Sequence, residues 1–209
     1  MQFSAEAESS GNAGTLWTAA AALLGLGAVA GFAATPGSLD WQPALAGPEP
    51  WRAWSAAWIH LSALHLAANL AGTALVGALG FVAGVPRRSV LAWFAAWPLT
   101  HFALLARPDL AHYAGLSGVL HAGVAVVSVH LIATARGGRR LIGFALLAAL
   151  AIKVASETPW AADPLRHPGG WDIAIAPFAH ASGLVAGVVV SALVEAAARW
   201  RPLTIDRND

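Results

Sequence analysis

The sequence contains no cysteine among its 209 residues. This absence excludes disulfide bonds, thiolate metal sites and a cysteine nucleophile together. Charged residues are also scarce: they make up 11% of the chain, whereas a soluble domain usually carries about 25%. Hydrophobic residues make up 57%, so the chain lacks the polar side chains that a water-facing surface requires. The composition therefore predicts a polytopic membrane protein.

Neither sign of charge predominates, because the formal net charge is only +1. This balance gives no polybasic surface, and nucleic acid is not an expected partner. The first fifteen residues contain Glu6 and Glu8 but no basic residue, and they lead directly into a long apolar run. They lack the basic n-region of a secretory signal. Residues 1–15 are expected to form a polar cytoplasmic tail.

Six apolar runs predict an all-α bundle of six transmembrane helices, forming one domain over residues 16–198. A spanning helix needs about 20 residues. The third run, which contains Pro98, and the fifth are short, which is tolerable where neighbouring helices shelter them. Residues 199–209 are expected to form a basic, polar C-terminal tail. The runs cover residues 16–34, 64–85, 90–105, 117–135, 141–155 and 176–198.

The basic residues predict the orientation of this bundle. Eight of the twelve Lys and Arg residues fall on one side of it. The positive-inside rule makes that side cytoplasmic and places both termini there. The fourth run then begins at the outer leaflet, and Lys153 is expected to snorkel from the outer end of the fifth. The eight residues are Arg87, Arg88, Arg136, Arg139, Arg140, Arg199, Arg201 and Arg207.

Polar side chains gather where the second run begins. His65 and Asn69 are four residues apart and share one face of a helix. Ser62 is expected to cap that helix, which leaves His60 just outside it. One such residue alone is typical of a satisfied helix interface. Three together at a helix mouth indicate a functional site, because polar groups in a bilayer are costly.

Ser117 begins the fourth run between Gly115 and Gly118. Taken alone, this segment is typical of a Gly/Ser packing seam between membrane helices. A serine hydroxyl is a poor nucleophile unless a base removes its proton. The unpaired N–H groups of a first helical turn could, however, hold a developing oxyanion. The alternatives stay open until a base is found.

The sixth run offers such a base in His180. Gly183 and Gly187 form a GxxxG pair, which allows close packing on a neighbouring helix. If that neighbour is the fourth run, the imidazole of His180 reaches the hydroxyl of Ser117, as general-base catalysis requires. His101 and His130 have no evident partner of this kind. They are expected to be buried, hydrogen-bonded histidines.

Together these motifs resemble the rhomboid family of intramembrane serine proteases. The resemblance implies that Ser117 is the nucleophile and that His180 is the base and then the acid. It also implies a dyad without a carboxylate, and the predicted helices contain no Asp and only Glu195, near the cytoplasmic end. No cofactor is implied. The motifs, in chain order, are Trp51–Arg52, HxxxxHxxxN at residues 60–69, GxSG at 115–118 and AHxxGxxxG at 179–187.

The resemblance also assigns supporting residues. The oxyanion hole would be formed by His65, Asn69 and the backbone N–H of Ser117. Trp51 and Arg52 would lie in the first outer loop and support the fold. His121 stands where many bacterial rhomboids carry a tyrosine that packs on the catalytic histidine. A structural, stacking role is expected for His121, and a second titrating role stays open.

The short first outer loop, about residues 35–50, and the segment GLSGVLHAG resemble the rhombosortase branch of the family. That branch implies membrane-anchored substrates with a C-terminal tail made of a GlyGly-type motif, one transmembrane helix and a basic end. It also implies the bacterial inner membrane, with the active site opening to the periplasm. A general rhomboid protease that cleaves other transmembrane proteins is the alternative.

Two further alternatives come from other functional classes. Eight histidines could ligate haem or a metal in a membrane protein, although no HExxH motif is present. An inactive rhomboid-like protein could bind transmembrane segments without cutting them. The intact serine and histidine argue against that second alternative.

Overall fold

The computed structural model describes residues 2–35 and 37–200, with side chains from Gly14 onward. Regular structure in that part of the chain is helical, apart from isolated β-bridges that pair Trp41 with Tyr113 and Arg166 with Ile175. The α-helices are α1 (Gln2–Gly31), α2 (Arg52–Ser55), α3 (Ala63–Ala83), α4 (Arg87–Phe102), α5 (Ser117–Thr134), α6 (Gly137–Ser156) and α7 (Pro177–Arg199), and the 3-10 turns are η1 (Pro43–Leu45), η2 (Ala56–Trp58) and η3 (Ala103–Ala106).

The six long helices coincide with the six apolar runs. The largest difference is at α1, which begins at Gln2 rather than near residue 16, so its first turns occupy the segment expected as a tail. Residues 201–209 of the expected C-terminal tail lie outside the described residues. The predicted cap of α3 is confirmed, because the Ser62 hydroxyl accepts the backbone N–H of His65 at 3.0 Å. His60 accordingly lies just ahead of the helix.

Five of these helices are long and apolar enough to cross a membrane: Gly14–Gly31 of α1, then α3, α4 continued to Ala106, α5 and α7. The sixth long helix, α6, has 20 residues but carries Arg139, Arg140 and Lys153 near its ends. Large apolar side chains such as Leu75, Val82 and Leu193 point outward from the bundle and are more than 60% exposed. An outward apolar surface of this kind is what a lipid environment requires.

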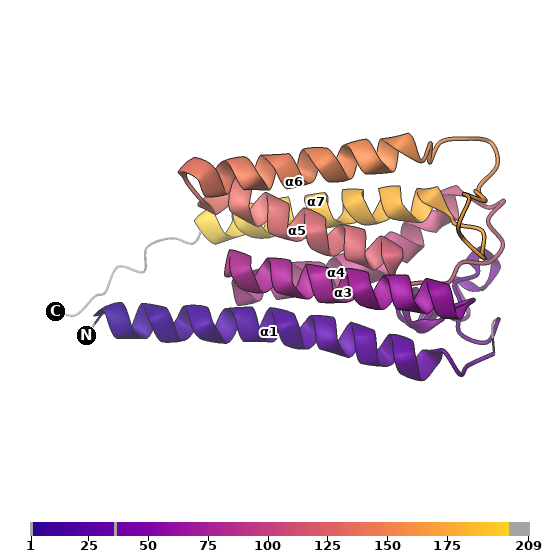
Figure 1. Ribbon diagram of the computed structural model, residues 1–209, viewed down its shortest axis with the longest axis horizontal. Helices are drawn as coiled ribbons and strands as arrows, with labels where there is room; N and C mark the ends of the chain where they lie inside the picture. The colour runs from indigo at the N-terminus through magenta and orange to yellow at the C-terminus, as the bar shows by residue number, and fades with distance from the viewer. Residues whose placement is uncertain (1, 36, 201–209) are drawn as a thin grey trace.

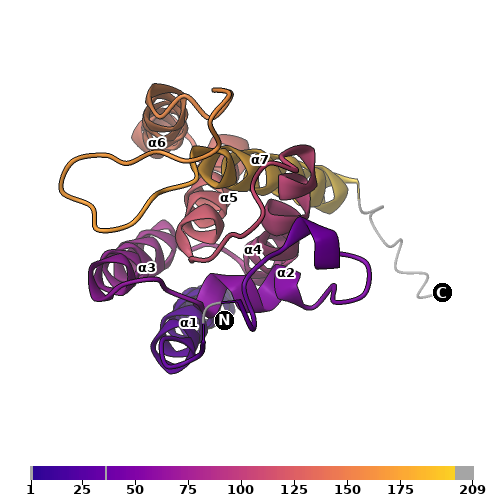
Figure 2. The same cartoon turned by 90° about the vertical axis from the view of Figure 1, so that its right-hand side faces the viewer.

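The long helices run side by side and alternate in direction, so the connections gather at two ends of the bundle (Figure 1). One end carries the α3–α4 and α5–α6 turns, the start of α1 and the end of α7. The other end carries α2 and the longer connections α1–α3, α4–α5 and α6–α7 (Figure 2). We call the second the loop end and the first the turn end.

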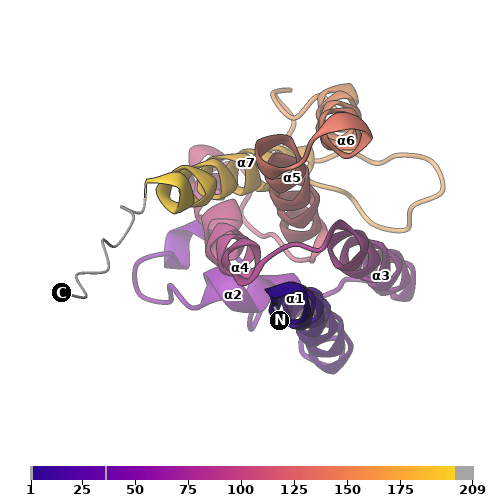
Figure 3. The same ribbon diagram turned by 90° about the vertical axis from the view of Figure 1, so that its left-hand side faces the viewer.

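Helix α5 lies at the centre of the bundle, among α3, α4, α6 and α7 (Figure 3). Of its span, 61% is buried inside the protein, against 28–44% for the other four candidate spans. Two tryptophans join α1 to α4: the rings of Trp17 and Trp93 stack at 4.3 Å. Their indole N–H groups donate to the carbonyls of Val76 and Val119, so neither buried donor is left unpaired.

A network of polar side chains holds the first connection at the loop end. Arg52 is buried and donates to the backbone and carboxylate of Asp40, and it also pairs with Glu49. His112 contacts the other carboxylate oxygen of Asp40 at 2.7 Å. Arg52 therefore fixes the connection between α1 and α3, whereas its neighbour Trp51 is 53% exposed.

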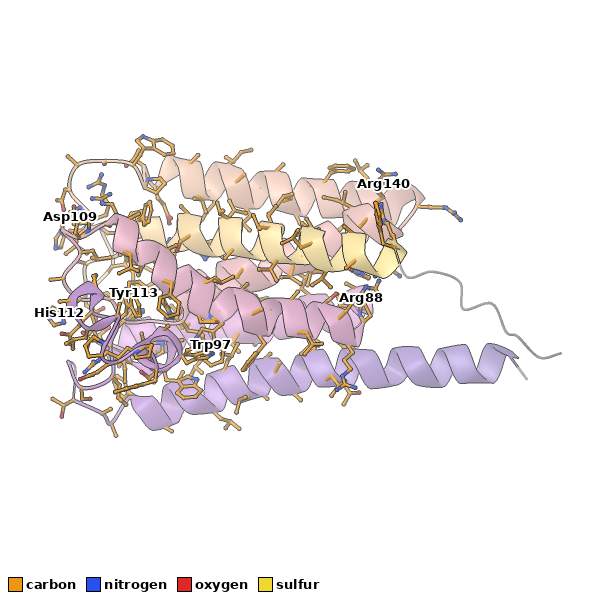
Figure 4. The ribbon with its side chains drawn as sticks, turned by 180° about the vertical axis from the view of Figure 1, so that it is seen from behind. Arg88, Trp97, Asp109, His112, Tyr113 and Arg140 are labelled. Carbon is orange, nitrogen blue, oxygen red and sulfur yellow. The ribbon has the colours of Figure 1, made fainter. Side chains whose placement is uncertain are left out.

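The turn end has its own buried polar cluster. Glu195 of α7 accepts hydrogen bonds from His130 of α5 at 2.8 Å and from Arg88 of α4 at 3.1 Å. Arg88 and Arg140 lie at this end of the bundle, and Asp109, His112 and Tyr113 lie at the other (Figure 4). The prediction that His101 and His130 are buried and hydrogen-bonded is confirmed, since His101 donates to the Ala53 carbonyl at 2.6 Å.

Candidate active site

Glycine residues bring α5 and α7 into backbone contact. A Cβ atom on Gly183 would overlap the carbonyl oxygen of Gly118, and one on Gly187 would lie 2.5 Å from the carbonyl oxygen of Ala122. In return, a Cβ atom on Gly118 would lie 2.7 Å from the carbonyl oxygen of Ala179. The GxxxG helix therefore packs against the GxSG helix, which is the condition under which the sequence brings His180 to Ser117.

This contact places two predicted site residues together. Ser117 is the first residue of α5 and His180 lies in the first turn of α7. The Nε2 atom of His180 is 2.9 Å from the Oγ atom of Ser117. The His180 side chain is buried. A hydroxyl and an imidazole at this separation are within the range needed for proton transfer.

Gly115 leaves open the space that His65 and Asn69 face. Its φ of +126° disfavours any side chain, and a Cβ atom there would lie 2.7 Å from Nε2 of His65 and 3.9 Å from Nδ2 of Asn69. Nδ2 of Asn69 is buried and has no hydrogen-bond partner among the described residues. A buried amide donor without a partner is costly. Such a donor is expected where a ligand atom binds and completes the hydrogen bond.

The tautomer of His65 follows from its other nitrogen. Nδ1 accepts the backbone N–H of Leu61 at 3.4 Å, so in the neutral ring the proton is on Nε2. That N–H points toward the space beside Gly115. His60 packs against this ring with its centroid 4.8 Å away, and burial lowers the pKa of His60. His65 and Asn69 thus present two N–H donors beside Gly115, which stands two residues before Ser117 in the sequence.

The buried Tyr113 hydroxyl lies beneath the same segment. It donates to the carbonyl of Gly115 at 3.3 Å and so helps to hold the bend that leads into α5. Burial raises the pKa of Tyr113, and its hydroxyl stays protonated at physiological pH. It therefore serves as a donor and not as a charged group.

The expectation that His180 has no carboxylate partner is wrong. Oε2 of Glu157 lies 2.6 Å from Nδ1 of His180. Glu157 is the residue directly after α6 and lies two positions beyond the predicted apolar run of residues 141–155, so it was not among the carboxylates of the predicted helices. Burial by itself would raise the pKa of this carboxyl, but the hydrogen bonds from His180 and Lys153 outweigh burial and hold it at about 2.

Lys153 also differs from expectation, because it binds side chains rather than extending into the interface. Its ammonium is 2.9 Å from Oε1 of Glu157 and 2.7 Å from Nε2 of His121. The spacing of Lys153 and Glu157, four residues apart at the end of an apolar helix, was the sequence signal for this pair. Only the fold shows that the pair faces His180.

His121 stacks on His180, as expected, with ring centroids 4.3 Å apart and planes 8° apart. Its Nδ1 atom donates to the Ser117 carbonyl at 2.7 Å, so in the neutral ring Nε2 accepts from Lys153. Both ring nitrogens are occupied in this way. His121 is thereby a packing and anchoring residue beside the reactive pair.

The connection between α6 and α7 is hydrogen-bonded to the start of α3 and to the connection between α4 and α5. The hydroxyl of Ser62 donates to Asp172 at 2.8 Å, and the guanidinium of Arg107 donates to the carbonyls of Ala161 and Ala162. Figure 2 shows this connection extending from α6 toward α3. Among the described residues, no group of three or more His, Asp or Glu side chains is arranged to hold a metal ion.

Comparison with protein families identifies a family for this chain. The sequence model of the Rhomboid domain matches residues 47–196, which is more than half of the 209 residues. The matched segment includes every motif from Trp51 to Gly187. The chain matches none of the curated proteins with which it was compared.

Proposed function

The chain belongs to the rhomboid family of intramembrane proteases, and on that premise we propose that it is a serine endopeptidase in which Ser117 and His180 cleave a membrane-anchored protein. The observation that carries the proposal is the 2.9 Å separation of Ser117 Oγ and His180 Nε2. The two residues are 63 positions apart in the sequence. They lie on helices α5 and α7, whose backbones come into contact at glycines.

The reaction follows the usual course of acyl transfer to serine. His180 Nε2 accepts the proton of the Ser117 hydroxyl while Oγ attacks the substrate carbonyl carbon. The same imidazole then gives that proton to the leaving amine as the C–N bond breaks. In the second half, water attacks the acyl-serine while His180 takes a proton from it. The imidazolium then returns that proton to Oγ as the C–Oγ bond breaks, so the acid product leaves and the serine hydroxyl is restored.

Three N–H groups are suited to stabilise the negative oxygen that forms during attack. They are Nε2–H of His65, Nδ2–H of Asn69 and the backbone N–H of Ser117, which lies in the first turn of α5, where no intrahelical partner exists. The space beside Gly115 is where the substrate oxygen would lie. Gly115 and Gly118 are needed because a side chain at either would fill the site or separate the helices.

We further propose that α6 also crosses the membrane, which gives six spans in a domain over residues 16–198. The loop end then faces the periplasm and the turn end, with Arg87, Arg88, Arg139 and Arg140, faces the cytoplasm of a bacterial inner membrane. Both termini would be cytoplasmic. The site would open near the outer surface, where water for the second step is available.

For the substrate we propose an exported protein with a GlyGly-type C-terminal tail, as in the rhombosortase branch. Support comes from the segment GLSGVLHAG and from the short connection before Trp51. Processing of other transmembrane proteins by a general rhomboid activity is the alternative. The two activities differ in whether cleavage requires a glycine motif ahead of the transmembrane helix of the substrate.

The test uses the full-length protein in liposomes with two substrates that share one transmembrane helix and basic end. One carries a GlyGly motif and the other carries Ala in its place. Ser117→Ala should reduce cleavage to background, whereas Ser128→Ala, a buried serine on the same helix whose hydroxyl bonds the Val124 carbonyl, should cleave normally. Cleavage of the GlyGly substrate alone supports the finer assignment, and equal cleavage of both supports the general activity. Full activity of Ser117→Ala would refute the proposed chemistry.

A further inference from the structure

A closed ring of side-chain contacts begins and ends at Ser117. Ser117 Oγ bonds Nε2 of His180 at 2.9 Å, and Nδ1 of that ring bonds Glu157 at 2.6 Å. The second carboxylate oxygen of Glu157 binds Lys153, which binds Nε2 of His121. Nδ1 of His121 then bonds the carbonyl of Ser117. The proposed pair of Ser117 and His180 uses only the first of these contacts.

We propose that Glu157 is a positioning residue that orients His180 and stabilises its protonated form, so that the reaction uses a Ser117–His180–Glu157 triad whose carboxylate is anchored by Lys153. This inference rests on the proposed serine-protease function. It differs from the two-residue arrangement implied by family resemblance.

The first argument concerns the tautomer of His180. A carboxylate only accepts hydrogen bonds, so Nδ1 of His180 carries a proton in the contact with Glu157. In the neutral ring, Nε2 then has a free lone pair, and it is Nε2 that faces the Ser117 hydroxyl. Without the carboxylate, nothing among the described side chains would select this tautomer over the unreactive one.

The second argument concerns charge. When His180 takes the serine proton, a cation forms in a buried position, and a nearby carboxylate offsets its cost. The titratable groups that face His180 are His121 on α5, Lys153 on α6, His65 across the site on α3, and Glu157. Of these only Glu157 is acidic, and its low pKa keeps it ionised.

The third argument concerns Lys153, whose ammonium is 3.3 Å from Nδ1 of His180. An ammonium cannot accept the Nδ1 proton, and it lies farther from Nδ1 than the carboxylate does. Its shorter contacts are to Glu157 at 2.9 Å and to His121 at 2.7 Å. Lys153 therefore fixes the carboxylate in place, and the stacked His121 fixes Lys153.

The experiment compares Glu157→Gln, Glu157→Asp and Asp163→Asn as full-length proteins in liposomes, with kcat and KM measured from about pH 5 to pH 9. Asp163 is the matched control, because it lies in the same connection and its Oδ1 accepts the backbone N–H of Leu165, a bond that asparagine can keep. Thermal unfolding and insertion are measured for each variant, so that a folding defect is separated from a catalytic one.

Glu157→Gln should lower kcat by about 10²- to 10⁴-fold and change KM by less than about threefold. The acidic limb of its pH–rate profile should move to lower pH, because an imidazolium without a carboxylate partner forms less readily. A residue that only supports the fold would not move that limb. Glu157→Asp should recover part of the lost kcat, and Asp163→Asn should match the wild type.

Equal kcat and equal pH profiles for Glu157→Gln and Asp163→Asn would overturn the triad while leaving the Ser117–His180 chemistry intact. If Glu157→Gln does not fold, Glu157→Asp decides by its own pH profile, and an unaltered limb with unaltered kcat overturns the proposal. Failure of the proposed function has a different signature: Ser117→Ala would still cleave.

Discussion

Among the described side chains, two histidine–glutamate pairs lie at opposite ends of the bundle, and one of them lies in the candidate active site. At the loop end, His180 bonds Glu157 at 2.6 Å and Lys153 holds the carboxylate. At the turn end, His130 bonds Glu195 at 2.8 Å and Arg88 holds the carboxylate. Each cluster consists of a histidine, a glutamate and a basic residue, which is lysine at the loop end and arginine at the turn end, and the distances are similar.

They differ in what the far side of the imidazole meets. Nε2 of His180 faces a serine hydroxyl in the first turn of a helix, beside an open space with two N–H donors. Nε2 of His130 is 3.4 Å from the hydroxyl of Thr134, which already donates to its own helix at 2.8 Å. Of the two clusters, the one at the loop end has a serine hydroxyl at the second ring nitrogen of its histidine and N–H donors nearby, and it is there that we propose the chemistry takes place.

The largest expected effect separates the two histidines. His180→Ala should lower kcat/KM by at least about 10³-fold, because it removes the proton acceptor. His130→Ala should keep activity within about threefold and lose thermal stability instead. Cleavage rates and unfolding of both variants in the same liposomes measure this contrast. An inactive but fully stable His130→Ala would contradict the structural role given to the turn end.

A smaller loss is expected from pushing the two helices apart. Gly183→Ala places a methyl group on the Gly118 carbonyl, and a displacement near 1 Å of the catalytic pair costs about 10²-fold in rate. Gly138→Ala is the matched control, since its side chain would meet nothing within 4 Å. Activity and thermal unfolding of both should be compared. Normal cleavage by Gly183→Ala would show that the close contact is not what positions His180.

The smallest effects concern stability and pH. Glu195→Gln should lower the free energy of unfolding by about 1–3 kcal/mol, because the Glu195 side chain is 5% exposed and its partners would lose a buried anion. Glu157, at 18% exposure, contributes less. Thermal unfolding of Glu195→Gln and Glu157→Gln measures the difference. A larger loss in Glu157→Gln would reverse the comparison.

The pH dependence of the stability difference between wild type and Glu157→Gln follows from the depressed pKa of the Glu157 carboxyl. The carboxyl of Glu157 has a pKa of about 2 in the folded protein, below the value of about 4.3 for an unperturbed glutamate. Its contribution is present above about pH 5 and is lost as pH falls toward 2. The stability gap between wild type and Glu157→Gln should therefore narrow below about pH 4.5, and a gap that widens there would have the wrong sign.

The long helices were predictable because an apolar helix of membrane-spanning length is recognised from its length and hydropathy. The start of α5 at Ser117 and the Ser62 cap followed from local patterns, and the GxxxG pair indicated a close-packing face without naming the helix that it packs on. Glu157 did not follow, because it lies outside the apolar runs and its partner is 23 positions away in sequence. Lys153 appeared to be an interfacial anchor because sequence alone assigns it no neighbour.

The sequence by itself determined the class of protein, the six long helices and the identity of the serine, histidines and glycines at the helix ends. Hydropathy and helical periodicity are local properties, so a single chain reveals them. The tertiary structure decided which helix the GxxxG pair packs on, which glutamate contacts His180 and which similar cluster lies away from Ser117. Those outcomes depend on backbone contact between α5 and α7 and on the direction in which the end of α6 faces, and neither is encoded within any one segment.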